Sequence, residues 1–171
     1  MSIILHMGKI HLYQIIFWIA NDRKTGKSAL WIGAMQGPNV QNSPEIIKEL
    51  TKYFWGYRTK NLILYATRAF ARAAGINTMY AVSNSGYYAN NHMRIDHKLK
   101  TSLDDFWQET GGIICEDERF YELPVVEHRK SIEEVKMHKR GQYRKCFEVL
   151  DTLDCTIEAM VKNYIKNNLV S

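Results

Sequence analysis

The chain has 171 residues, so we expect one domain at roughly 150 residues per domain. Hydrophobic residues make up 46% of it and charged residues 24%, a balance that supports a buried core and that disordered chains lack. The longest apolar segment, residues 10–20, falls short of the roughly 20 residues that cross a bilayer, and no export signal is recognisable at the start. We therefore expect a cytoplasmic protein that can lie peripherally at the inner membrane.

The first third of the chain predicts a β-hairpin. Residues 10–20 and 28–36 are rich in β-branched and aromatic types, and turn-forming residues separate them, so the two segments should pair antiparallel. Strict alternation along the second strand places Met35 on the face opposite Leu30 and Ile32. Because both alternating sets are apolar, we expect a sheet that is covered on both faces.

Two helices should follow the hairpin. Ser43 is a suitable N-cap and Pro44 a suitable first helical residue, so a helix should start at Pro44 and end near Gly56. A second helix is predicted for about residues 61–74, with Gly75 as its C-terminal cap. In this helix Arg68 lies off the apolar stripe.

Shorter elements complete the predicted sheet. Residues 77–83 read as a strand, Ser102 starts a short helix that stops at Gly111, and residues 113–115 and 119–123 read as short strands. Together the elements predict an α/β (α+β) fold with a mixed, largely antiparallel central sheet flanked by helices.

From Ser131 the pattern is helical to near the C-terminus. Apolar residues recur at steps of four and three, which predicts a long amphipathic helix; they are Cys146, Leu150, Leu153, Ile157, Met160 and Tyr164. We expect residues 1–130 to form the sheet domain and residues 131–171 a helical segment that packs on it. The same stripe can instead form the interface of a homo-oligomer.

Short motifs give no sign of a metal or a cofactor. The three cysteines, Cys115, Cys146 and Cys155, are odd in number and lack the C-x-x-C spacing of a zinc ribbon. Neither H-E-x-x-H nor G-x-x-x-x-G-K-[ST] occurs, and Pro38 removes a backbone N–H that a phosphate loop would use. We therefore expect reduced thiols, no metal and no bound cofactor.

The positive charge is concentrated at the front of the last predicted helix. Between Arg129 and Lys145 there are seven basic and two acidic residues, an excess equal to the net charge of the whole chain, +5. Such a block favours an anionic partner, whether a lipid, an RNA or an acidic protein. The candidate contacts are Lys136, Lys139, Arg140, Tyr143 and Arg144. The alternative is a basic face that contacts only water.

Two residues are candidates for acid–base chemistry. His92 lies in the long irregular segment 84–100, and Glu109 lies on the short helix with other carboxylates. The alternatives are a solvated loop histidine and a solvated acidic helix face.

Several phrases, in this order, resemble the VirK family of enteric bacteria: Trp31-Ile32-Gly33, Ala66-Thr67-Arg68, Val82-Ser83-Asn84, Asp105-Phe106-Trp107 and Lys139-Arg140 to Tyr143-Arg144. The resemblance covers about residues 28–155. Members carry a longer N-terminal segment, so the chain resembles a shortened one. The resemblance implies a virulence-associated accessory protein of a Gram-negative bacterium, which supports surface display of a virulence factor and resistance to antimicrobial peptides. It implies no catalytic residue.

The order of the elements is also similar to the later half of GNAT-type acyltransferases. That superfamily holds coenzyme A with a Q/R-x-x-G-x-G/A loop, which residues 36–43 do not contain. This second resemblance implies a GNAT-like fold. It leaves, as the alternative function, an acyltransferase with a non-standard cofactor loop that uses His92 or Glu109.

Overall fold

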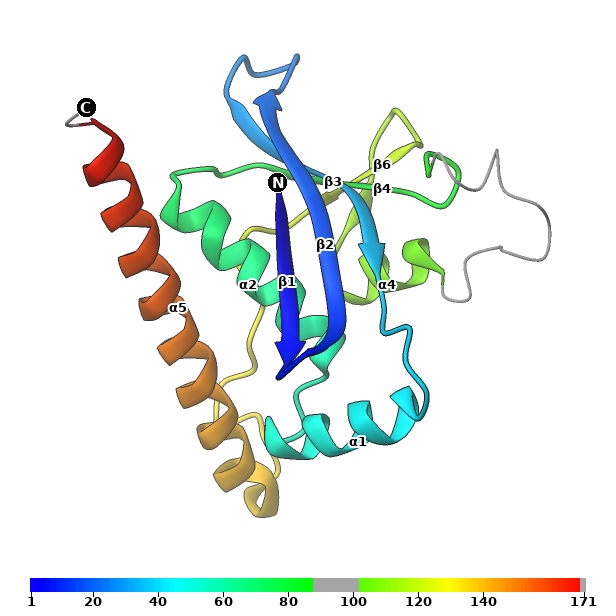
Figure 1. Cartoon of the computed structure of the whole chain (residues 1–171), viewed down its shortest axis with the longest axis vertical. Helices are drawn as coiled ribbons and strands as arrows, with labels where there is room; N and C mark the ends of the chain where they lie inside the picture. Colours follow the sequence, from blue (N-terminus) through cyan, green and yellow to red (C-terminus); the bar gives the residue numbers. More distant parts are fainter. Residues whose placement is uncertain (88–101, 170–171) are drawn as a thin grey trace.

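The computed structural model describes residues 1–87 and 102–169 and has a six-stranded sheet at its centre (Figure 1). The strand order is β1-β2-β3-β4-β6-β5, and all neighbours are antiparallel except the parallel pair β3 and β4. The strands are β1 (Ser2–Met7), β2 (Ile10–Asn21), β3 (Ser28–Gln36), β4 (Met79–Val82), β5 (Ile113–Ile114) and β6 (Phe120–Leu123). The predicted mixed, largely antiparallel sheet is confirmed.

The predicted helices are present as well. They are α1 (Ser43–Tyr53), α2 (Thr59–Ala73), α4 (Leu103–Glu109) and α5 (Arg140–Leu169). A 3-10 turn that was not predicted, η2 (Met137–Lys139), precedes α5. The prediction of Ser43 as N-cap is wrong, because Ser43 is the first residue of α1 and the N-cap is Asn42, whose side chain makes no capping hydrogen bond. Ser102 caps α4 by accepting a hydrogen bond from the backbone N–H of Asp105. Gly75, at φ +71°, follows α2 as expected for a C-terminal glycine.

The last helix begins later than its periodicity indicates. Residues 131–136 form turns, and α5 starts only at Arg140. The guanidinium of Arg140 donates to the backbone oxygens of Val135, at 3.0 Å, and Glu133, at 3.1 Å. These bonds, together with the buried side chain of Val135, hold the preceding residues in a fold-back that a continuous helix would not allow.

Strand β1 was not predicted from the sequence. It pairs antiparallel with β2 through a turn at Gly8, whose φ of +59° favours glycine. Its residues Ile3 and Leu5 pack against the main core, while Ile4 between them is exposed. The sheet therefore begins one strand earlier than the predicted hairpin.

A bulge at Gly33 makes the predicted facing of Met35 wrong. Ile16 of β2 pairs with Ala34, but the next residue pairs with Ile32, so Gly33 is an extra residue in β3. An extra residue reverses the alternation beyond it. Met35 is consequently buried in the same cluster as Leu30 and Ile32.

The main core lies between the sheet and the helices α2 and α4. Ile63 and Leu64 of α2 and Trp107 of α4 are fully buried in it, and the Trp107 ring N–H donates to the backbone oxygen of Val82 at 2.9 Å. The second face of the sheet is less covered than expected. Trp18 on that face stays 45% exposed and stacks on Trp31.

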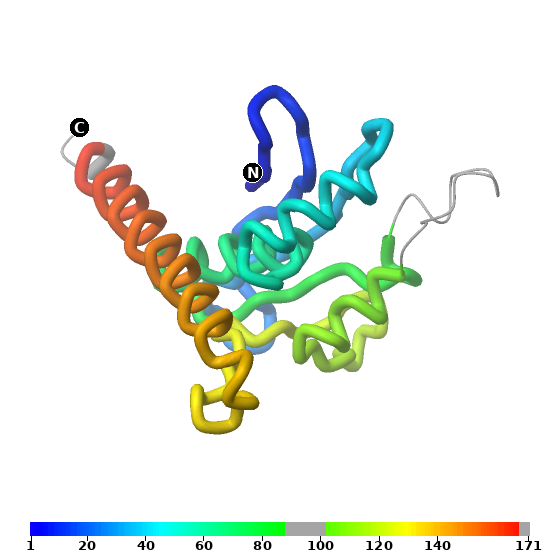
Figure 2. The backbone as a smooth tube through the Cα atoms, turned by 90° about the horizontal axis from the view of Figure 1, so that it is seen from below, coloured from blue at the N-terminus to red at the C-terminus, as the bar shows by residue number. Residues whose placement is uncertain are grey.

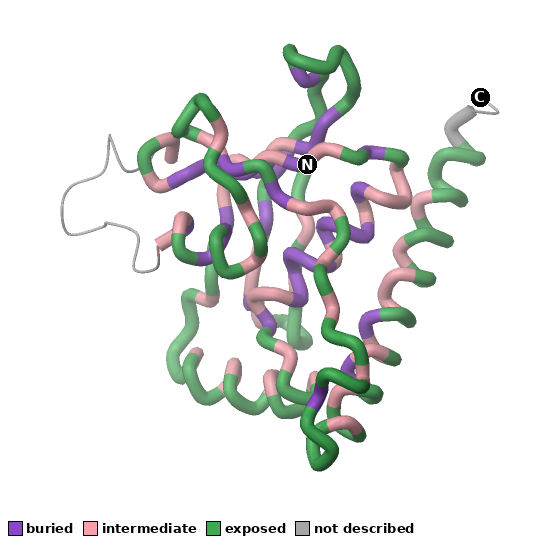
Figure 3. Tube along the Cα trace, turned by 180° about the vertical axis from the view of Figure 1, so that it is seen from behind, coloured by how far each residue is buried: buried purple, intermediate pink, exposed green. Residues whose placement is uncertain are grey.

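Helix α5 forms a separate rod on the α2 side of the molecule (Figure 2). Its front half is docked, because Cys146 and Leu150 are buried against Leu62 and Tyr65 of α2. The rear half projects from the body, and Met160 is 66% exposed (Figure 3). The apolar stripe is therefore divided: its front half packs within the chain, and a homo-oligomer interface through its rear half stays a prediction.

Candidate functional site

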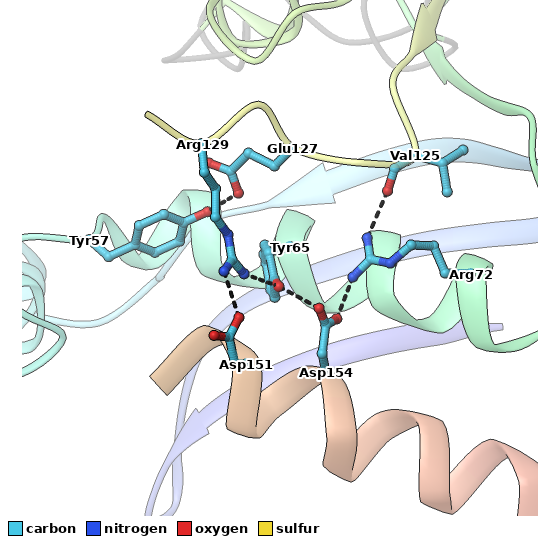
Figure 4. A network of polar contacts seen from close by, with 8 residues as sticks. All are labelled: Tyr57, Tyr65, Arg72, Val125, Glu127, Arg129, Asp151 and Asp154. Atoms are coloured by element: carbon cyan, nitrogen blue, oxygen red, sulfur yellow. Dashed lines mark hydrogen bonds and ion pairs between the residues drawn. The ribbon is translucent and has the colours of Figure 1, made fainter. Parts of the chain in front are cut away.

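An extended strap, residues 124–131, joins β6 to the front of α5 and lies across α2 (Figure 4). Arg72 of α2 donates to the backbone oxygen of Val125 at 2.8 Å. The hydroxyl of Tyr57 donates to the carboxylate of Glu127 at 2.5 Å. The strap is thus fixed by side chains from the first half of the chain, and it brings Arg129 and Lys130 beside α5.

A polar network ties this strap to α2 and α5. Arg129 forms an ion pair with Asp151 of α5 at 2.6 Å and donates to the hydroxyl of Tyr65. Tyr65 in turn donates to Asp154 at 2.6 Å, and Arg72 forms an ion pair with the same carboxylate. Asp154 therefore binds two side chains of α2, while Asp151 binds Arg129 of the strap (Figure 4).

Burial and charge shift the pKa values of this network. Burial raises the pKa of Tyr65 to about 12, and the hydrogen bond to Asp154 adds to the effect. Burial and the bond to Glu127 likewise raise the pKa of Tyr57. Burial opposes the charge of Arg129, but Asp151 and the other acceptors outweigh it and raise its pKa.

The raised tyrosine pKa predicts a loss of stability at alkaline pH. A group whose pKa is higher in the folded state contributes stability that is present below its unfolded pKa and is lost as the pH rises through its folded pKa. For Tyr65 this interval runs from 10.0 to about 12. Urea unfolding across this interval should show a fall in the free energy of unfolding that is shallower in Tyr65→Phe. Equal slopes in both proteins would contradict the assignment.

A pocket of about 420 Å³ opens between the strap, the turn that follows α1 and the first turns of α5. Aromatic side chains and Leu150 form its apolar wall, and Arg129, Lys130 and Lys139 supply positive charge. The complete lining is Trp55, Gly56, Tyr57, Glu127, His128, Arg129, Lys130, Lys139, Gln142, Tyr143, Cys146, Phe147 and Leu150. Such a cavity can hold a small anionic group against an apolar wall.

The structure separates the predicted basic contacts into two groups. Lys136, Lys139 and Arg144 are exposed, and none of them forms an ion pair with a carboxylate of residues 1–87 or 102–169. Arg140 is committed to backbone oxygens, and Tyr143 lies in the pocket wall with its ring against Phe147. The first group is therefore available to an anion.

The acid–base candidates do not come together in the described residues. Glu109 forms an ion pair with Arg58 at 2.6 Å on the surface. His92 lies outside the residues that the structure describes. Glu109 does not line the pocket at α5.

Comparison with known proteins places the chain in a family. The model of a protein family of unknown function, DUF535, matches residues 1–159. The chain belongs to the DUF535 family.

Relatives of this DUF535 chain occur in Escherichia coli K12 and Haemophilus influenzae Rd. The first, the uncharacterized protein YbjX, is 31% identical over 90% of this chain and 46% of its own length. An uncharacterized protein of H. influenzae is 32% identical over 76% of this chain and 43% of its own length. The chain therefore spans less than half the length of these curated relatives. No solved structure matches it significantly.

Sequence reasoning did not anticipate two parts of this DUF535 site. Trp55 and Tyr57 were not among the predicted site residues, and Arg129 was counted only as part of a basic block. A signal for Arg129 was present in the sequence, because Arg129 lies between an extended segment and a helix that carries aspartates with which it could pair.

No helix of the described residues has the length and apolar composition to cross a membrane.

Proposed function

We propose that this DUF535 chain is a non-enzymatic accessory protein that binds an anionic partner through a basic face at the front of α5. The basic face consists of Lys136, Lys139, Arg140, Tyr143 and Arg144. The observation that carries the proposal is that Lys136, Lys139 and Arg144 are exposed and form no salt bridge within the described residues, beside a pocket that Lys139 and Lys130 line. Arg144 lies near Glu133 and helps to lower the pKa of that carboxyl, but the cations of this segment remain in excess. Exposed cations in excess attract phosphate or carboxylate groups.

The resemblance to the VirK family supports an envelope role for this binding. It would make the chain a virulence-associated accessory of a Gram-negative enteric bacterium, acting in surface display of a virulence factor and in resistance to antimicrobial peptides. A cytoplasmic protein at the inner membrane meets phospholipid headgroups, RNA and acidic segments of precursor proteins, and each is an anionic partner of the kind that a basic face attracts.

Charge reversal tests the proposal. A triple variant with Lys136, Lys139 and Arg144 each changed to Glu should bind anionic vesicles, RNA and acidic peptides at least about tenfold more weakly in low salt. Arg140 is left unchanged because its bonds to backbone oxygens hold the start of α5. Added salt should weaken wild-type binding steeply.

The matched control reverses the same number of charges at the other end of the molecule, at Arg23, Lys27 and Lys166, which are exposed. Because the control and the test variant have the same net charge, equal binding by both would show that only overall charge matters and would overturn the proposal. Binding measured by fluorescence anisotropy and by vesicle sedimentation covers the three partner classes.

A GNAT-like acyltransferase is the second candidate, and the parallel pair β3 and β4 favours it. The two strands pair from Leu30 with Met79 to Ile32 with Ala81, and β4 ends at Val82 while β3 runs on to Gln36 beside β2. In open α/β sheets, ligands bind outside the carboxyl ends of the strands. The carboxyl ends of β3 and β4 therefore offer a place for an extended cofactor even without the usual phosphate loop.

A thermal-shift assay separates the two candidates. A cofactor that binds the folded chain raises its melting temperature as the ligand concentration increases. The basic face attracts acetyl coenzyme A and ATP alike, because both are polyanions. If the chain has a specific site for the cofactor, acetyl coenzyme A should raise the melting temperature more than ATP does at the same concentration. Equal shifts, or none at millimolar ligand, would contradict the acyltransferase.

A further inference from the structure

We propose that one end of the molecule binds the surface of an anionic lipid bilayer and inserts apolar side chains between its headgroups. This basal end consists of the last turn of α1, the turn that follows it, η2 and the first turns of α5. The inference rests on the proposed function, because it names the anionic partner of the basic face.

Side-chain contacts bring these segments together. The amide of Gln142 donates to the backbone oxygen of Trp55 at 2.8 Å, and the ammonium of Lys145 lies 4.2 Å from the centre of the Trp55 ring. In Figure 1 the end of α1 and the start of α5 lie side by side at the bottom of the molecule. Trp55 and Lys145, which lie far apart along the chain, therefore belong to one surface.

Large apolar side chains are exposed on this surface. Met137 is 82% exposed in η2, Tyr53 is 75% exposed at the end of α1, and Trp55 is 40% exposed. Met137 belongs to neither apolar cluster of the described residues, so its side chain contributes little to the stability of the fold. Burying such a side chain in a bilayer is favourable by about 1.5–3 kcal/mol relative to water.

Exposed cations lie on the same segments as these apolar side chains, and one of them, Lys145, contacts the Trp55 ring. They are Lys52, Lys136, Lys139, Arg144 and Lys145. Two carboxylates, Glu133 and Glu134, lie on the same segment, and the first is near Arg140 and Arg144 and accepts a hydrogen bond from Ser131. The cations remain in excess, so the surface is complementary to an anionic leaflet.

The combination of residue types favours a bilayer over the other anionic partners. Lys and Arg hold anionic headgroups, while Trp, Tyr and Met enter the region between headgroups and acyl chains. Binding to RNA would also use the cations, but it would leave Met137 exposed, because a base needs a ring to stack on and a methionine side chain has none. Only a bilayer uses both the charges and the apolar side chains of the basal end.

The test measures sedimentation of the full chain with vesicles of phosphatidylcholine alone and of equal parts phosphatidylcholine and phosphatidylglycerol. Wild type should bind only the anionic vesicles. The double variant Tyr53→Ser with Met137→Ser should bind these vesicles at least about tenfold more weakly. Both side chains are mostly exposed, so the fold should not depend on them. Its binding to RNA and to an acidic peptide should stay as in wild type.

Met160→Ser is the matched control, because Met160 is 66% exposed at the far end of α5. If the double variant binds anionic vesicles like this control, the insertion of apolar side chains is wrong. If wild type binds RNA or the acidic peptide through the basic face but no vesicle, the bilayer is overturned while the proposed function stands. If no anionic partner binds, both fail.

Discussion

Replacing Leu150 with Ala should destabilise the protein by about 2–5 kcal/mol. Leu150 is 1% exposed and lies in the apolar cluster where α5 docks against Leu62 and Tyr65 of α2. The truncation removes buried methyl groups and leaves a cavity that two packed helices cannot close completely. Urea unfolding followed by circular dichroism measures the loss, and hydrogen exchange should show α5 opening before the sheet.

Met160→Ala on the same helix is the control. The same kind of truncation at a side chain that is 66% exposed should change the free energy of unfolding by no more than about 0.5 kcal/mol. Similar losses at the two positions would mean that α5 is held along its whole length, contrary to the divided stripe.

Asp154→Ala should cost about 1–3 kcal/mol, because it leaves two partly buried donors without an acceptor. The carboxylate of Asp154 accepts from the hydroxyl of Tyr65 at 2.6 Å and pairs with Arg72, so one substitution breaks these two polar contacts between α5 and α2. The free energy of unfolding in urea at neutral pH measures the effect.

Asp151→Ala provides the comparison one helical turn earlier. Its carboxylate is 64% exposed and, among the residues that the structure describes, pairs with Arg129 alone, and an exposed ion pair contributes about 0–1 kcal/mol. We therefore expect a clear difference between two aspartates three residues apart. Equal losses would show that the network in Figure 4 stabilises the fold through the strap as much as through α2.

Local patterns predicted most of the elements because each depends on neighbouring residues. The β-branched and aromatic residues of segment 10–20, the Pro44 in the first turn of α1 and the Ser102 cap of α4 are all decided within one or two turns of chain. Strand β1 was not predicted from these local patterns. It is a short edge strand, and its pairing with β2 creates the pattern that identifies it.

Such local patterns could not predict which charged residues are buried. Arg68 was placed only off the apolar stripe of its helix, yet it is 2% exposed and donates to the backbone oxygen of Thr110 at 2.8 Å. Burial lowers its pKa. The acceptor lies 42 residues further along the chain, so no local spacing indicates the contact.

The sequence by itself determined the fold class, the long terminal helix and the concentration of positive charge, because periodicity and composition are properties of contiguous residues. Only the tertiary structure decided which cations form ion pairs and which stay exposed without a salt bridge in the described residues. Arg129 and Lys139 lie in one basic block, but the strap carries the first to Asp151 while the second stays exposed at the pocket. The tertiary structure also placed Trp55 beside Lys145. Contacts between distant segments depend on how the layers pack, and packing is decided by the whole chain at once.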